Sequence, residues 1–281
     1  MIRIVLFTIS TIFFAKISAQ DSSLLFVKTS PDLGNRAITC MTTDSKNHMW
    51  IGTYGGGLKR YDGLNVETYS HDPFSETSIS NSTIFDLVSI KNQGLWIATQ
   101  NGINHFNPNT KSFSLFNPKS DFISVHSLCE IDENVLVVGT HQKGIYFFNT
   151  ADKTFDKISI PKSINENGLL INDVIVDQLN RVWVGSNYGV FIVDRNTQKL
   201  SRASYHLSKS NDLSNIEVIS LANDRFGNIW IGTAEDGLFK VFPGSANNFE
   251  LEHYKITTKR IFSVQEYNNK YMIMGTENDG L

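Results

Sequence analysis

One short motif occurs six times in this chain, and the repeat limits the possible folds more than any other feature. The copies read WIGT at 50–53, WIAT at 96–99, VVGT at 137–140, WVGS at 183–186, WIGT at 230–233 and IMGT at 273–276. Successive copies start 41 to 47 residues apart, and a glycine follows each: Gly57, Gly102, Gly144, Gly189, Gly237 and Gly280. A period in the forties is typical of a β-propeller, in which each repeat forms one blade.

Each repeat contains the pattern of a four-stranded blade. Twelve residues before the motif stands a β-branched residue, which indicates a first strand: Ile38, Ile84, Val125, Ile171, Val218 and Ile261. The motif is apolar on both faces, as expected for a second strand between two other blades. A third strand follows the second glycine, and residues 113–116 and 155–158 are examples of the expected fourth strand. We predict an all-β fold, a β-propeller of four-stranded blades with six repeats present and seven in the intact protein.

The recurring aspartates and glycines of the repeat are predicted to have structural roles in turns and packing. Asp44, Asp177 and Asp224 share one place in the turn after the first strand, where an aspartate accepts a hydrogen bond from the backbone two residues on. The motif glycine is expected to leave room beside an indole. The glycine-rich segment 54–59 joins two strands and lacks the ending of a phosphate-binding loop. We therefore predict a β-turn there, with glycines at positive φ.

The ends of the chain differ from the repeat. Arg3, the apolar stretch 4–15 and the small residues before Gln20 indicate a signal peptide over residues 1–19. The predicted domain is a β-propeller over residues 20–281, incomplete at its C-terminus, because Leu281 falls at the start of the sixth unit's third strand. Residues 24–28 resemble an additional fourth strand. A net charge of −3 and a pI near 6.2 give no reason to expect contact with nucleic acid.

Two sets of side chains on the first strands are of a type that can take part in disulfide formation or catalysis. Cys40 and Cys129 fall on first strands of blades that are not neighbours, so we predict two free, buried thiols and no disulfide. Ten residues before the motif, every repeat has a small side chain facing the channel: Cys40, Asp86, Ser127, Asp173, Ser220 and Ser263. Crowding near the axis explains this column, and Asp86 and Asp173, two blades apart, are not expected to converge as a hydrolytic pair.

No catalytic residue, cofactor site or metal site is predicted from the sequence. His-Glu-x-x-His and Cys-x-x-Cys patterns are absent from it. A ligand is expected at the channel mouth, on the loops that enter the first strands, because binding residues concentrate on loops held by a rigid scaffold. Asn35, Asn81 and Asn215 share one such position, with Arg36 beside the first. Asparagine is also a routine turn residue, so these four are candidate ligand-binding residues with a structural alternative.

The complete repeat resembles the two-component regulator propeller repeat. Residues 223–233, NDRFGNIWIGT, followed by Asp236-Gly237-Leu238, carry the pattern almost unbroken, and 57–63 with 71–73 are similar to the opening repeat of such sensors. Val137 and Ile273 replace the tryptophan, and Ala98 replaces the motif glycine. The resemblance implies a periplasmic ligand-sensing domain of a hybrid sensor histidine kinase that is anchored in the inner membrane and responds to a small molecule or oligosaccharide.

The same resemblance implies particular partners for this segment. They are a kinase module in the same polypeptide, no nucleic acid, and a second copy in a homodimer of the full-length protein. The segment itself is expected to be non-catalytic. Two alternatives remain open: an exported propeller enzyme of the polysaccharide lyase or quinoprotein type, and a secreted interaction scaffold.

Overall fold

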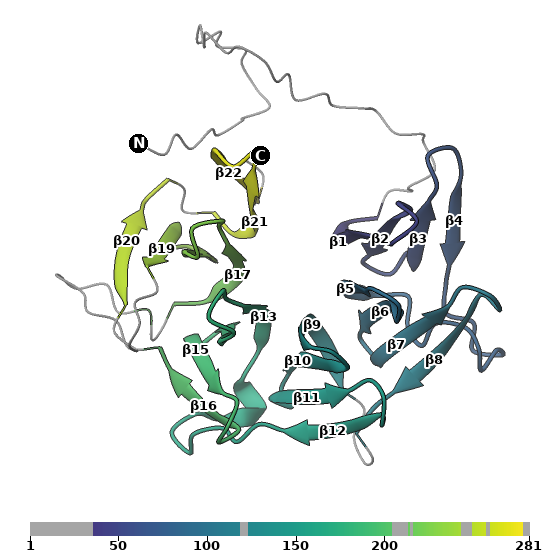
Figure 1. Ribbon diagram of the computed structural model, residues 1–281, viewed down its shortest axis with the longest axis horizontal. Helices are drawn as coiled ribbons and strands as arrows, with labels where there is room; N and C mark the ends of the chain where they lie inside the picture. Colours follow the sequence, from purple (N-terminus) through teal and green to yellow (C-terminus); the bar gives the residue numbers. More distant parts are fainter. Residues whose placement is uncertain are drawn as a thin grey trace, which may run out of the picture.

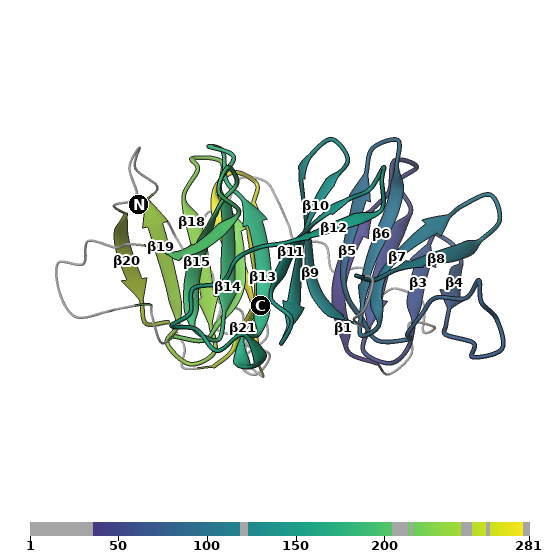
Figure 2. The ribbon, with the colours of Figure 1, turned by 90° about the horizontal axis from the view of Figure 1, so that it is seen from below.

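The described chain forms an incomplete ring of antiparallel sheets (Figure 1). The computed structural model describes residues 36–118, 123–203, 213, 216–242, 249–256 and 259–277. Over these residues there are five four-stranded sheets and one two-stranded sheet, each with its strands in chain order. The first strand of each sheet lies on the inside of the ring and runs roughly along the ring axis, while the outer strands are turned away from that direction (Figure 1 and Figure 2). The predicted all-β propeller is confirmed.

Each repeat builds one blade as a simple meander. Blade 1 contains β1 (Ile38–Thr43), β2 (Met49–Thr53), β3 (Leu58–Tyr61) and β4 (Val66–Tyr69). Blade 2 contains β5 (Ile84–Ile90), β6 (Gly94–Thr99), β7 (Gly102–Asn107) and β8 (Ser112–Phe116). Blade 3 contains β9 (Ser124–Asp132), β10 (Val135–His141), β11 (Ile145–Asn149) and β12 (Thr154–Lys157). The fourth strands predicted near 113–116 and 155–158 are β8 and β12.

The second half of the ring repeats this arrangement. Blade 4 contains β13 (Ile171–Val176), β14 (Val182–Ser186), β15 (Gly189–Asp194) and β16 (Lys199–Arg202), preceded by a short 3-10 helix, η2 (Glu166–Gly168). Blade 5 contains β17 (Val218–Asn223), β18 (Ile229–Thr233), β19 (Leu238–Phe242) and β20 (Glu250–Tyr254). The described part of blade 6 contains β21 (Ile261–Tyr267) and β22 (Tyr271–Thr276). The signal peptide expected at 1–19 and the extra strand expected at 24–28 lie outside the described residues.

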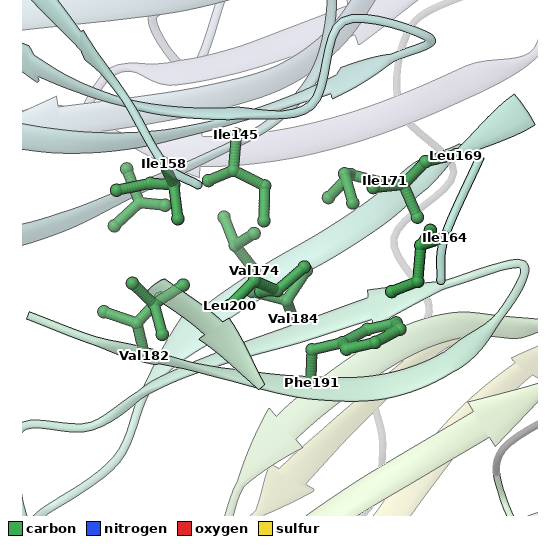
Figure 3. Packing of buried hydrophobic residues seen from close by; sticks show 12 residues of the cluster. Ile145, Ile158, Ile164, Leu169, Ile171, Val174, Val182, Val184, Phe191 and Leu200 are labelled. Carbon is green, nitrogen blue, oxygen red and sulfur yellow. The ribbon is translucent and has the colours of Figure 1, made fainter. Parts of the chain in front are cut away.

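The apolar cores lie between neighbouring blades. Figure 3 shows the core between blades 3 and 4, where Ile145 and Ile158 of one blade meet Val174 and Val184 of the next. Equivalent clusters join the other described neighbours. The four tryptophans are among the largest buried side chains, at most 2% exposed. Burial of both faces of the second strand explains why the motif is apolar throughout.

The motif glycine makes room for the following blade rather than for an indole. A Cβ on Gly185 would lie 2.6 Å from Val218 Cγ1, and one on Gly139 would lie 2.6 Å from Ile171 Cγ2. A Cβ on Gly52 would lie 2.8 Å from Cγ2 of Ile84, and one on Gly232 would lie 2.8 Å from Cγ2 of Ile261, the equivalent residues of the next blades. The expectation about the indole is therefore wrong. The glycine instead matches the β-branched residue twelve positions before the next motif, so two columns of the repeat form one interblade contact.

The three turn aspartates accept the predicted backbone hydrogen bonds and also hold a tryptophan. Asp177 Oδ1 accepts from Leu179 N at 2.9 Å and from Arg181 N at 2.8 Å, while its Oδ2 accepts from Trp183 Nε1 at 2.8 Å. Asp44 and Asp224 accept in the same way from the indoles of blades 1 and 5. The sequence predicted the hydrogen bonds within the turn but not the hydrogen bond from the tryptophan indole. A constant Asp-x5-Trp spacing in three repeats was the available signal.

Other details of the repeat are settled by the structure. Gly55 and Gly57 have φ of +73° and +79°, as predicted for the glycine-rich turn. Both cysteines are free. They are partly exposed rather than buried, because the first strands on which they lie face the channel.

Candidate functional site at the channel mouth

Every described first strand has the same irregularity near its start. The pairing register shifts between the residues twelve and ten positions before the motif, which leaves the residue between them unpaired as a β-bulge. This end of the channel, where the chain enters the first strands and where the second strands end, is called the mouth here. The bulged residues are Thr39, Phe85, His126, Asn172, Ile219 and Phe262.

Three aromatic rings stack along the mouth across blades 2 and 3. The ring centroids of Phe85 and His126 are 3.8 Å apart, and those of His126 and His141 are 3.2 Å apart with planes inclined by 11°. His141 ends β10, next to the loop that leads into β11. The bulge in β9 turns His126 out of the ladder and brings it against both neighbours.

Hydrogen bonds continue this row of side chains into blades 4 and 5. His126 Nε2 lies 3.0 Å from Ser124 Oγ, and His141 Nε2 lies 3.3 Å from Asn172 Oδ1. Asn172 Nδ2 donates to the carbonyl of Val218 at 2.7 Å. One imidazole nitrogen of each histidine is thus engaged within the row.

The histidine pair is uncharged at neutral pH. Burial and the adjacent His141 lower the pKa of His126 to about 3, and burial also lowers the pKa of His141. Two stacked imidazoles cannot both take a proton without strong repulsion. This part of the mouth therefore combines aromatic rings with neutral hydrogen-bonding groups.

Two carboxyl groups meet one serine directly below this row. Ser127 Oγ lies 3.3 Å from Asp86 Oδ2 and 3.1 Å from Asp173 Oδ1. The expectation that the two aspartates do not converge is wrong, because the serine of the blade between them bridges them. Burial raises the pKa of Asp86 to about 6. Burial, together with the charge of Asp86, raises that of Asp173 to about 7.

These carboxyl groups are already engaged by backbone donors. Asp86 accepts from Leu87 N and Leu128 N, both at 2.8 Å. Asp173 accepts from Val174 N at 2.8 Å and from Leu221 N at 2.7 Å. Leu128 and Leu221 each belong to the following blade, so the carboxylates connect blades. Their occupied oxygens do not resemble a pair poised to attack a substrate.

The structure places two of the four ligand-binding residues predicted from the sequence. Arg36 is exposed and lies beside Gly56 in the loop between β2 and β3. Asn81 accepts a hydrogen bond from Thr83 N at 2.8 Å, so it serves a turn at the entrance of β5. Asn35 and Asn215 lie outside the described residues. The histidine row was not predicted, because His126 and His141 occupy different columns of the repeat and are brought together only by the bulge.

Among the described residues, no group of three or more histidine, cysteine or acidic side chains is arranged to hold a metal ion. The same part of the chain has no helix with the length and apolar character needed to cross a membrane.

The comparisons with known proteins agree with the repeat. The family model described as "Two component regulator propeller" matches residues 32–55 and 212–235. Two segments of this β-propeller, in blades 1 and 5, are thus similar to the two-component regulator propeller repeat. A curated relative, histidine kinase P4 of Formosa agariphila, is 27% identical over 169 residues. That match covers 54% of this chain and 12% of the relative.

Solved structures share the fold. The extracellular domain of the putative one component system BT4673 of B. thetaiotaomicron, also described as a putative hybrid two component system, has a TM-score of 0.68 and 25% identity. The match covers 86% of this chain and 31% of that one.

PorZ, a surface component of the type-IX secretion system of Porphyromonas gingivalis, has a TM-score of 0.63 at 20% identity, with 86% of this chain and 38% of that chain covered. Virginiamycin B lyase from Staphylococcus aureus has a TM-score of 0.65 at 11% identity, with 89% and 80% covered. The last two likenesses concern the fold alone. The chain spans less than a third of the length of histidine kinase P4 and of the BT4673 domain.

Proposed function

We propose that this chain is the extracytoplasmic sensing propeller of a two-component signalling protein and has no catalytic role of its own. The observation that supports this most is the combination of the regulator repeats with the likeness to a histidine kinase and to an extracellular domain of such a system. The kinase partner in the same polypeptide, the signal peptide, membrane anchoring and homodimer formation belong to this proposal.

The ligand-binding part of the proposal concerns the mouth. Phe85, His126, His141 and Asn172 form a continuous row of aromatic and neutral polar side chains over blades 2 to 4. A neutral oligosaccharide or another small polar molecule suits such a row, because stacked rings contact apolar faces while amide and imidazole edges bind hydroxyl groups. Arg36 and Asn81 remain candidates on the entering loops.

A further blade beside β1 is also part of the proposal. Ile38, Met41 and Met49 are 48%, 62% and 38% exposed, whereas their equivalents in blades 2 to 6 are at most 8% exposed. In those blades the same three positions are covered by the preceding blade. The exposed face of β1 and β2 therefore suits one more propeller unit.

Thermal shifts with a panel of oligosaccharides and small polar metabolites test the ligand site. For any compound that raises the melting temperature, His141→Ala is expected to weaken binding at least tenfold in calorimetry. Phe226→Ala, at a 70% exposed position in the turn between β17 and β18, at the end of these strands away from the mouth, serves as the matched control and is expected to bind normally. Equal loss in both variants would contradict a site at the mouth.

Reading the gene around this chain tests the signalling role separately. A reading frame that continues through more repeats to an apolar span of roughly 20 residues and a kinase supports the proposal. A frame without a membrane span or kinase would favour a secreted scaffold.

A further inference from the structure

We propose that Asp86, Ser127 and Asp173 share one proton up to about neutral pH, and that this proton fastens blades 2, 3 and 4 to one another beside the channel mouth. The inference does not depend on the proposed sensing function. It concerns how the propeller is held together and how that hold changes with pH.

The first step is the hydrogen-bonding capacity of Ser127. A hydroxyl group has one donor and two acceptor positions. The N–H of Val174, which is shared with Asp173 Oδ1 at 2.8 Å, donates to Ser127 Oγ at 3.0 Å and uses one acceptor position. One donor and one acceptor remain, yet a carboxyl oxygen faces the hydroxyl on each side, from Asp86 at 3.3 Å and from Asp173 at 3.1 Å.

Two ionised carboxylates do not satisfy this arrangement. The serine would donate to one of them, and its remaining lone pair would point at an oxygen of the other. A proton on one carboxyl group removes the conflict, because that acid donates to Ser127 Oγ while Ser127 donates to the remaining carboxylate. Every position of the hydroxyl is then used, and one of the bonds is strengthened by charge.

The backbone explains why one proton is held rather than two. Four N–H groups point at the pair, from Leu87 and Leu128 to Asp86 and from Val174 and Leu221 to Asp173. Such donors favour an ionised carboxylate. Burial and mutual repulsion act against two charges, so a single negative charge balances both demands. Burial raises the pKa values to about 6 for Asp86 and about 7 for Asp173, so the last proton leaves the pair close to neutral pH.

The titratable groups that face the three residues do not supply a competing charge. Burial, with Asp86 as a further cause, raises the pKa of Cys40 on β1 far above its usual range. Burial, with Asp173 and Asp86 as further causes, raises that of Cys129 on β9 to about 12. Both thiols therefore stay neutral. His126 and His141, at the mouth above, have lowered pKa values and are neutral as well. On β17, Ser220 donates to the carbonyl of Ile261.

The shared proton has a defined structural effect. Asp86 lies in blade 2, Ser127 and Leu128 in blade 3, Asp173 in blade 4 and Leu221 in blade 5. Losing the proton breaks one of the two hydrogen bonds between Ser127 and the carboxyl groups of the neighbouring blades. Because the pKa values are raised in the folded protein, the stabilisation is fully present below the ordinary aspartate pKa near 4. It is lost as pH rises through 6 to 8.

Carboxyl ¹³C NMR of the full chain labelled at aspartate tests the proposal directly. We expect wild-type protein to show a carboxyl signal that titrates with a midpoint above pH 5.5. Asp173→Asn is expected to abolish that titration, because Ser127 then donates to Asp86 alone. Asp156→Asn, on exposed β12, is the control and should leave the signal in place. If every wild-type aspartate titrates below pH 5, the proposal is wrong.

The pH dependence of stability provides a second measurement. Between pH 6 and 8.5 we expect the melting temperature of wild type to fall more than that of Asp173→Asn, because only wild type loses the shared proton in this range. Equal falls in the two proteins would contradict the link between blades.

Discussion

Among single residues, the turn aspartates of blades 1, 4 and 5 each accept two kinds of hydrogen bond. One oxygen of the turn aspartate caps the backbone, and the other accepts the indole N–H of the buried tryptophan. Trp96 in blade 2 is different, because Ile90 occupies the aspartate position. Its buried Nε1 has no hydrogen-bond partner among the described residues. Lys153 Nζ instead lies 5.0 Å from the Trp96 ring centroid.

The aspartate in the blade 4 turn is expected to be the most sensitive of the three. Asp177→Ala leaves the indole of Trp183 and two backbone N–H groups without an acceptor. Since each buried unsatisfied group costs about 1–3 kcal/mol, we expect a loss of about 3 kcal/mol in the free energy of unfolding. Urea denaturation measures this. Asp156→Ala, on the exposed outer strand, should change stability by less than about 0.5 kcal/mol.

The stacked histidines predict a loss of stability in acid. Their pKa values are lowered in the folded protein, so the stabilisation is present above the unfolded value near 6.5 and is lost as pH falls below it. We expect His126→Phe, which retains a ring against Phe85 and His141, to lose less stability than wild type between pH 7 and pH 5, by roughly 1 kcal/mol. Urea midpoints at the two pH values check this, and identical midpoint shifts would contradict it.

At the scale of the element, the second strand of one blade is matched to the first strand of the next. Gly185→Ala places a Cβ within 2.6 Å of Val218 Cγ1, and overpacking of this kind costs about 1–3 kcal/mol. Gly275 has the same place in blade 6, but among the described residues only the flexible hydroxyl of Ser263 would lie near its Cβ. We expect Gly275→Ala to be clearly milder in thermal unfolding. Equal effects would show that contact with the next blade is not what requires glycine.

The strands themselves were predictable from the sequence, whereas the contacts between columns were not. Six copies of one pattern fix where strands start and which faces are apolar, because the same residue types recur at the same spacing. The meeting of His126 with His141, and of Asp86 with Asp173 through Ser127, depends on which side chain of one blade faces which side chain of the next. That information is spread over positions about 15 to 90 residues apart and does not repeat.

At the scale of the whole molecule, the two ends of the ring present different surfaces. Blade 1 exposes Ile38, Met41 and Met49, while Phe262 in blade 6 is 56% exposed. Apolar surface of this kind favours association. We expect Met41→Lys to increase the monomeric fraction of this chain in light scattering after gel filtration. Leu179→Lys, at an apolar residue of similar exposure (60%) in blade 4, should have no such effect, and a similar increase in both would contradict a specific role of the blade 1 face.

The bulge in every described first strand separates positions whose residue types recur in each repeat from one whose residue type varies. Its neighbours are constrained, one to a β-branched side chain against the previous blade's glycine and the other to a small one beside the axis. The bulged residue itself is Thr, Phe, His, Asn, Ile or Phe in the six blades. Each described blade thus contributes one position at the channel mouth whose residue type the repeat does not fix. In the proposed sensing role, substitutions at these positions would change what the mouth binds, while the two columns that pack the blades stay the same.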